Sequence, residues 1–333
     1  MRDAGWLYQC PVCAGGLTAA HGPPNEDIEA SELRCPAGHV YPVLRGVPRF
    51  TPTEDYAGNF GFEWTLHDRT QLDDSTSRES EETFRAKTGF TPEELRGKTV
   101  LDVGCGMGRF ADVASRWGAQ VYAIDLSLAV ESAQRNLGGR VSVHIAQASI
   151  FALPFAEEVF DFIFSIGVLH HTPDTRSAFE RLPRLLKPGG KIAIWLYPRY
   201  DSVPSYVSDV LRKLTIRMPK RLLYAISHLA VPAYYLYRMP RLGLLPRSLL
   251  PLSTHPKRRW RVLDTFDWYS PRYQWKHTYE EVWPWFETAG LTEIRVLGSP
   301  VALQAKRPGA GTNPTVNEDR GPGRRVSRAG PVA

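Results

Sequence analysis

The stretch from Thr99 to Ser127 constrains the fold of this chain more than any other. It reads TVLDVGCGMGRFADVASRWGAQVYAIDLS, which predicts a strand, a glycine turn, a helix and a second strand. Thr99–Val103 is apolar and rich in β-branched residues, and the glycines that follow allow a tight turn free of side chains. Apolar residues then recur at helical spacing over Phe110–Trp117, with Gly118 as a C-cap, and Val121–Ile124 is apolar again. We therefore expect the first βαβ unit of a nucleotide-binding α/β sheet.

Two acidic residues narrow the choice of ligand. Asp102 precedes the turn, where a carboxylate would repel a pyrophosphate and attract a cation, and Asp125 ends the second strand, where it can accept hydrogen bonds from a ribose diol. The third glycine, Gly108, follows Gly106 by two residues, not by three as in the dinucleotide fingerprint. S-adenosylmethionine has an adenosine ribose, an ammonium group and no phosphate, so it fits this pattern. A dinucleotide site or an unliganded turn is the alternative.

Four motifs extend this interpretation to a family. The segments VLDVGCGMGRF, VYAIDLS, FDFIFSIGVLHH and LLKPGGKIAIW resemble class I S-adenosylmethionine-dependent methyltransferases, over about residues 99–306 with one large insertion. The resemblance implies a Rossmann-like, doubly wound, seven-stranded and mostly parallel sheet. It also implies that the glycine turn and Asp102 hold the methionine part of the cofactor and that Asp125 holds the ribose.

The cofactor residues expected from this resemblance follow the ends of the first four strands. They are Asp102, Gly104, Cys105, Gly106, Gly108, Asp125, Leu126, Ser149, Ile150 and Ser165. Ser149 stands where many members place an acid for the adenine amino group, so the adenine contact departs from the family pattern. We interpret Cys105 as a small packed residue and not as a nucleophile.

The remaining elements of the sheet are predicted from apolar runs and helical periodicity. The predicted helices and strands are Ala129–Leu137 (helix), Val141–Ala146 (strand), Phe160–Ile166 (strand), Ala178–Leu186 (helix), Lys191–Tyr197 (strand), Thr278–Ala289 (helix), Thr292–Leu297 (strand) and Val301–Lys306 (strand, antiparallel). Thr91 should cap a short helix in which Pro92 takes the first position.

Residues 1–50 are predicted to form a small zinc ribbon. Cys10 and Cys13 form one pair of ligands and Cys35 and His39 the other, a spacing that suits tetrahedral zinc with three thiolates and one imidazole. A reduced loop without metal is the alternative. The continuation HVYPVLRGVPRF resembles zinc ribbons that precede some bacterial methyltransferases.

Residues 51–98 are interpreted as a connector between the ribbon and the sheet. Phe60, Phe62 and Trp64 either cap the cofactor or pack the ribbon onto the main domain.

Candidate catalytic and substrate residues follow later strands. His170 or His171 could serve as a general base after the fourth strand, although this di-histidine also occurs in the family where no base is needed. The segment DWYSPRYQ resembles one found in methyltransferases with the same ribbon. Its position suggests an acceptor pocket formed by Trp268, Tyr269, Arg272, Tyr273 and His277.

Residues 199–261 are predicted to be a basic helical lid inserted into the methyltransferase domain. Its Lys and Arg residues alternate with apolar and aromatic ones, a composition that suits anionic lipid headgroups. RNA phosphates would suit the charge equally, and a packed cap without a polyanionic partner is a third interpretation. Residues 307–333 lack periodicity and are interpreted as a disordered tail.

The sequence thus predicts a methyltransferase for a small-molecule acceptor or one linked to a lipid or carrier. The alternative is an RNA base methyltransferase that uses the ribbon and insertion to bind RNA. Intact Asp102, Asp125 and glycines disfavour a non-enzymatic scaffold. The net charge of +6 permits an anionic partner. Because the N-terminus lacks a signal-peptide pattern and no stretch is long enough for a transmembrane segment, we expect a cytoplasmic protein that contacts the inner membrane face peripherally.

Overall fold

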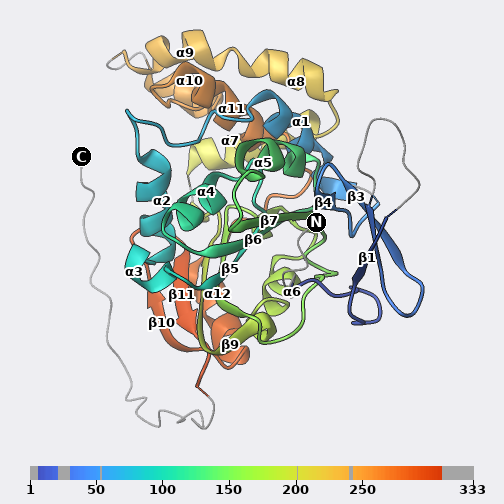
Figure 1. Ribbon diagram of the computed structural model, residues 1–333. Coiled ribbons are helices and arrows are strands. Elements are labelled where there is room, and N and C mark those ends of the chain that lie inside the picture. The colour runs from blue at the N-terminus through green and yellow to red at the C-terminus, as the bar shows by residue number, and fades with distance from the viewer. Residues whose placement is uncertain (1–6, 22–30, 53–54, 201, 240–242, 310–333) are drawn as a thin grey trace, which may run out of the picture.

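A seven-stranded sheet forms the centre of the computed structural model, which describes residues 7–21, 31–52, 55–200, 202–239 and 243–309 (Figure 1). The strand order across this sheet is β10-β11-β9-β8-β5-β6-β7. The strands are β5 (Thr99–Val103), β6 (Gln120–Asp125), β7 (Val143–Gln147), β8 (Phe160–Ile166), β9 (Leu186–Trp195), β10 (Thr292–Val296) and β11 (Ala302–Lys306).

The first five of these strands are parallel, and β5 lies between β6 and β8. Strand β11 pairs antiparallel with β9, and β10 pairs antiparallel with β11. Because the chain reverses its strand order after β7, the carboxyl ends of β5, β6 and β8 border one crevice. The predicted doubly wound, mostly parallel fold is confirmed.

Alternate residues of the central strands bury against different helix layers. Val100 and Val121 pack with α2 (Glu79–Thr88), α4 (Arg109–Arg116) and α5 (Ala129–Leu137). Leu101 and Val103 belong to the core that also contains α6 (Thr175–Glu180) and α12 (Tyr279–Thr288). This two-sided burial explains why the strands read as continuous apolar runs.

One predicted helix differs from the structure. The prediction over Ala178–Leu186 is wrong, because α6 ends at Glu180 and a 3-10 turn follows over Pro183–Leu185. The Asp174 carboxylate caps α6 by accepting from the Ser177 N–H, which sets an earlier start. Strand β9 begins at Leu186, so the Lys-Pro-Gly-Gly segment after it lies inside the strand and does not end a helix.

The N-terminal residues form a separate antiparallel sheet beside the edge strand β7. Its strands are β1 (Thr18–His21), β2 (Ser31–Arg34), β3 (Val40–Leu44) and β4 (Val47–Pro48). Directly after β4, the Phe50 N–H donates to the Gln147 carbonyl at 2.8 Å. The N-terminal module, drawn in blue in Figure 1, therefore covers the edge that β7 would otherwise expose.

A helical cap lies over the carboxyl ends of the strands. It combines the connector and the insertion (residues 199–261): α1 (Gly58–Leu66), α7 (Val203–Thr215), α8 (Lys220–Ser227), α9 (Ala230–Tyr237), α10 (Leu244–Leu249) and α11 (Arg258–Tyr269). Phe62 of α1 packs against Phe266 of α11 and Tyr224 of α8, with ring centroids 5.8 and 6.0 Å apart. Figure 1 shows α8, α9 and α10 on the outer side of this cap.

Smaller elements complete the described chain. A 3-10 turn covers Asp55–Ala57, and α3 (Pro92–Leu95) begins at the predicted Thr91 cap. The predicted tail, 307–333, lies outside the described residues from 310 onward. Within the described ranges, every helix is too short or too polar for a membrane span.

Candidate active site

A cavity of about 440 Å³ lies between the carboxyl edge of the sheet and the helical cap. Loops after β5, β6, β7, β8 and β9 form its floor, and α1, α2 and α11 contribute its walls. Side chains and backbone from these elements line the cavity, among them Phe60, Glu63, Trp64, Lys87, Gly104, Cys105, Gly106, Arg109, Asp125, Leu126, Ile150, His171, Trp195, Tyr197, Trp260, Asp264, Asp267 and Trp268.

The glycine turn after β5 lies against this cavity. The N–H groups of Gly104 and Cys105 both donate to the Ile124 carbonyl, at 2.8 and 2.9 Å, which joins the turn to β6. Gly104 has φ +83°, and a Cβ atom there would lie 2.3 Å from the Val168 side chain. A side chain is therefore excluded for two independent reasons.

Asp125 lies at the end of β6 and lines the cavity. Its carboxylate accepts hydrogen bonds from the Gly106 N–H at 2.9 Å and from the N–H and hydroxyl of Ser127 at 2.8 Å each. These bonds fix the orientation of the carboxylate at the mouth of the glycine turn. Such an acid can accept further hydrogen bonds from a diol.

Asp102 lies beneath the turn and does not line the cavity. Its side chain is 2% exposed, and Oδ2 has no hydrogen-bond partner in the described structure. Burial, together with the charge of Asp125, raises the pKa of Asp102 well above its ordinary value. A cation bound at the turn would stabilise this buried acid.

The other predicted cofactor residues divide into two groups. Gly104, Cys105, Gly106, Leu126 and Ile150 line the cavity, whereas Gly108, Ser149 and Ser165 do not.

The residues of the second group have local structural roles, and their contact with a cofactor stays a prediction. Gly108 is the N-cap of α4, the Ser149 hydroxyl accepts from the Phe151 N–H at 3.2 Å, and the Ser165 hydroxyl donates to the Val103 carbonyl at 2.9 Å. Burial also raises the pKa of the Cys105 thiol, so this residue lacks the thiolate character of a nucleophile.

Only one of the two predicted catalytic histidines lines the cavity. His171 does so, and its Nδ1 lies 2.9 Å from the Tyr273 carbonyl, which makes Nδ1 the protonated nitrogen and Nε2 the acceptor. His170 is fully buried outside the cavity, and its Nδ1 accepts from the Tyr197 N–H at 3.3 Å. Burial lowers the pKa of both imidazoles, so both are neutral at pH 7. The geometry therefore favours His171 over His170 for a base role, which stays a prediction.

The predicted acceptor residues lie in different places relative to the cavity, and their contact with an acceptor stays a prediction. Trp268 lines the cavity, but Tyr269, Arg272, Tyr273 and His277 do not. Helix α11 continues through Tyr269, so the side chains of Trp268 and Tyr269 leave it about 100° apart. The Tyr269 hydroxyl instead donates to the Pro251 carbonyl at 2.6 Å.

Several cavity residues were not predicted from the sequence. Glu63, Asp264 and Asp267 bring three carboxylates from two helices, and Lys87, Arg109 and Trp260 lie on the walls. A signal was present, since Asp264 and Asp267 are three residues apart on an aromatic-rich helix and therefore share a face. Glu63 stands between two aromatic residues in FGFEW, and nothing in its local pattern identifies a site.

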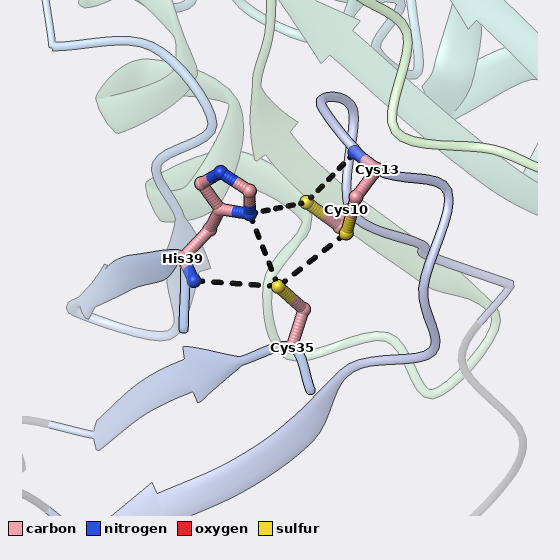
Figure 2. A group of neighbouring side chains, drawn as sticks. All are labelled: Cys10, Cys13, Cys35 and His39. Atoms are coloured by element: carbon pink, nitrogen blue, oxygen red, sulfur yellow. Dashed lines mark hydrogen bonds between the residues drawn. The ribbon is translucent and has the colours of Figure 1, made fainter. Parts of the chain in front are cut away.

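A second candidate site lies in the N-terminal module, where Figure 2 shows Cys10, Cys13, Cys35 and His39 converging. Their ligand atoms all lie within 4.8 Å of one another. The Cys35 sulfur is 3.6 Å from the Cys13 sulfur and 3.2 Å from His39 Nδ1. Tetrahedral zinc with bonds of about 2.3 Å to sulfur requires ligand separations of about 3.6–3.8 Å. The donor set and its spacing therefore fit zinc.

Comparison with known protein families identifies the domain that contains the parallel strands and the glycine turn. Residues 101–194, from β5 to β9, match a family model described as a methyltransferase domain. This segment is a methyltransferase domain. It contains the glycine turn, Asp125 and His171, so most of the cavity floor belongs to the matched segment.

The curated relatives that match this methyltransferase domain are named for different acceptors. Phosphoethanolamine N-methyltransferase 2 of Caenorhabditis elegans is 38% identical over 124 residues, which cover 34% of this chain and 28% of that protein. Ubiquinone biosynthesis O-methyltransferase of Alkalilimnicola ehrlichii is 38% identical over 101 residues, covering 29% and 41%. The chain thus spans less than half the length of these relatives.

A solved structure with a similar fold is phosphoethanolamine N-methyltransferase 2 of Haemonchus contortus with S-adenosyl-L-methionine. The TM-score is 0.43 at 19% identity, covering 77% of this chain and 47% of that one.

Proposed function

We propose that this protein transfers the methyl group of S-adenosylmethionine to a small-molecule or lipid-linked acceptor. The observation that carries the proposal is the cavity at the carboxyl ends of β5, β6 and β8, whose floor is the glycine turn and Asp125 of the matched methyltransferase domain.

The residues present fit S-adenosylmethionine. Asp125 would accept hydrogen bonds from the ribose hydroxyls, and Gly104 and Gly106 line the same cavity, where they would lie beside the methionine part. The buried Asp102 favours a cation above the turn, and the ligand carries both an ammonium and a sulfonium group. When bound, the cofactor supplies an electrophilic methyl group on a sulfonium sulfur.

The chain contributes alignment and exclusion of water. Phe60 and Trp64 of α1 and Trp260 and Trp268 of α11 wall the cavity with aromatic surface. Closing a reaction space in this way positions donor and acceptor about 3 Å apart and keeps water from the methyl group. Nε2 of His171 is the acceptor nitrogen of a neutral imidazole and can receive a proton from an acceptor that carries one.

The acceptor is proposed to be small because the cavity lies under the helical cap. The curated relatives include an N- and an O-methyltransferase, so they support a small acceptor without choosing between nitrogen and oxygen.

We also propose that Cys10, Cys13, Cys35 and His39 hold a structural zinc ion. With four protein ligands the site is closed, so no coordination position is left for a substrate.

A membrane role for the insertion is proposed from its outer surface. Val203, Tyr206, Val210 and Leu214 lie along α7 at helical spacing and are 45–72% exposed. Exposed Lys213 and Arg217 accompany them. Apolar side chains beside cations suit an anionic lipid surface.

Two basic residues of the insertion do not take part in this surface. Arg212 and Arg261 are buried and donate to backbone carbonyls, among them those of Trp268, Pro271 and His255. Their role is to hold α7 and the start of α11 in place.

Titration calorimetry with S-adenosylmethionine and with NADH tests the proposed function. We expect saturable binding of S-adenosylmethionine. Tighter binding of NADH would overturn the proposal, since the site would then be a dinucleotide site.

A further inference from the structure

Three carboxylates converge on the wall of the cavity that faces the helical cap. Glu63 comes from α1, and Asp264 and Asp267 come from one face of α11. All three line the same cavity. Burial, and then the charges of Asp267 and Asp264, raise the pKa of Glu63 well above its ordinary value, so these acids hold protons unless a bound cation lets them ionise.

Glu63 is the decisive residue of this cluster. Its side chain is 1% exposed, and neither carboxylate oxygen has a hydrogen-bond partner in the described structure. A buried carboxylate without any partner is costly, and natural proteins retain one where a ligand completes it. Because Glu63 lines the cavity, that ligand would lie in the cavity.

The two aspartates are held in place by neutral groups. The Tyr197 hydroxyl donates to Asp267 at 2.7 Å, and the Ser253 hydroxyl donates to Asp264 at 3.1 Å. In the part of the chain that the structure describes, neither aspartate nor Glu63 forms an ion pair. The two aspartates are therefore oriented, and no cation of the described chain is in direct contact with the cluster.

The cations of the cavity make their direct contacts with other groups, and Arg109 and Lys87 act on Asp264 only through space. Arg109 donates to the Ser80 hydroxyl at 2.9 Å and to the Gln71 amide oxygen at 3.3 Å, and its guanidinium lies over Trp260. The Lys87 ammonium lies 3.1 Å from the centre of the Trp195 ring. His255 bonds to Glu79 at 2.9 Å. A cation in direct contact with the acidic cluster would then come from a bound molecule.

We infer that the cavity accepts an amine and that Glu63, Asp264 and Asp267 bind its nitrogen, which makes the methylated atom nitrogen rather than oxygen. This inference rests on the proposed function and names the acceptor class for that site. The aromatic walls at Tyr197 and Trp268 suit an alkylammonium group, because ring faces attract cations.

The chemistry of the transfer favours nitrogen in this surrounding. A carboxylate first takes a proton from the bound ammonium, which frees the nitrogen lone pair. That lone pair forms a bond to the methyl carbon, and the electrons of the breaking carbon–sulfur bond remain on sulfur. Positive charge thus passes from sulfur to nitrogen, beside the carboxylates. Carboxylates stabilise that developing charge, whereas they would raise the energy of a phenolate or carboxylate acceptor.

Two probes of the same shape, one charged and one neutral, distinguish binding that depends on charge from binding that depends on shape. Choline carries a quaternary ammonium, and 3,3-dimethylbutan-1-ol is its uncharged counterpart. Each is titrated into the full chain saturated with S-adenosylhomocysteine, with tryptophan fluorescence as the readout, since four tryptophans line the cavity. We expect choline to bind at least tenfold more tightly than the alcohol, and Glu63→Gln to reduce this preference at least fivefold.

Control variants make the outcome decisive. Glu82→Gln removes an exposed acid from α2 and should leave the preference unchanged. If Glu63→Gln fails to fold, as judged by its melting curve, Asp267→Asn replaces it. Equal binding of the two probes would overturn the inference. So would a preference that survives both cavity variants, or a tenfold loss of S-adenosylhomocysteine affinity in Glu63→Gln with an unchanged preference.

The two proposals fail differently. If S-adenosylmethionine binds but choline shows no preference, the amine inference is wrong and the proposed function stands. If S-adenosylmethionine does not bind, the proposed function itself is wrong.

Discussion

Arg49 of the N-terminal module donates a hydrogen bond from Nη1 to Oε1 of Gln147 at 3.2 Å. Gln147 ends the edge strand β7, and its own Nε2 donates to the Leu126 carbonyl at 2.9 Å. Leu126 lines the cavity next to Asp125. A chain of two hydrogen bonds therefore joins the module to the loop that is proposed to hold the ribose, and Arg49 also pairs with Glu131 of α5.

Replacing Arg49 should loosen both the module and this loop. Arg49 is 6% exposed, so Arg49→Met removes the buried cation that pairs with Glu131 and bonds to Gln147, and should cost about 3 kcal/mol of unfolding free energy. We expect weaker S-adenosylmethionine binding as well. Chemical denaturation and calorimetry measure both effects.

Arg45→Met is the matched control for that change. Arg45 also pairs with Glu131, but its side chain is 71% exposed, so its loss should change stability by no more than about 0.5 kcal/mol. Equal effects of the two substitutions would contradict the role assigned to Arg49.

The metal prediction is one zinc ion per chain. Cys35→Ser removes one of four ligands and should abolish stoichiometric binding and destabilise the module, because so small a sheet has little core of its own. Elemental analysis of protein purified without chelators checks this. Protein free of metal, or full zinc content in Cys35→Ser, would refute the four-ligand site.

Asp264 predicts a pH dependence of stability. Burial, and then the charge of Asp267, raise the pKa of Asp264 from 3.8 to about 7. The folded state therefore binds more protons than the unfolded state between these values, so the contribution of Asp264 to the unfolding free energy falls as pH rises from about 4 to about 7. Asp264→Asn should remove this loss, which is at most about 4 kcal/mol.

The measurement compares the two proteins at pH 4.5 and pH 8 by urea denaturation. The variant should gain stability relative to wild type on going to pH 8. The neutral buried histidines contribute with the opposite sign in both proteins, so they cancel in the comparison. A difference that does not change with pH would show that Asp264 is not protonated in the folded protein near pH 6.

The membrane proposal predicts a charge-dependent association. Flotation with phosphatidylglycerol vesicles should carry the protein at moderate salt, and Lys213→Glu with Arg217→Glu should abolish it, since each basic residue near the surface contributes about 1 kcal/mol. Charge reversal at Arg307, outside the insertion, is the control. Tight, salt-sensitive RNA binding without vesicle binding would instead support the RNA alternative.

The sheet was predictable from the sequence because its signals are local. The bounds of β8 and α5 agree with the prediction, since a continuous apolar run and a regular helical period define them. The error at α6 arose where the Asp174 cap and Pro183 outweighed the apolar spacing.

The site was less predictable because its residues meet through tertiary contacts. Glu63 and Asp264 are about two hundred positions apart in the sequence and share a cavity only because α1 packs on α11. The adjacent residues His170 and His171 differ in placement, since only His171 lines the cavity, and a sequence motif does not encode that. The glycine turn was predictable because its function depends on local backbone geometry.

The most direct test of the central claim is calorimetric titration of S-adenosylmethionine into wild-type protein and Asp125→Ala. We predict binding to wild type and a loss of about 1.5–3 kcal/mol in the variant, because charge-assisted hydrogen bonds to the ribose are removed. Equal affinities would contradict the ribose assignment. Absence of binding to folded, wild-type protein would contradict the proposal that this cavity is a methyltransferase cofactor site.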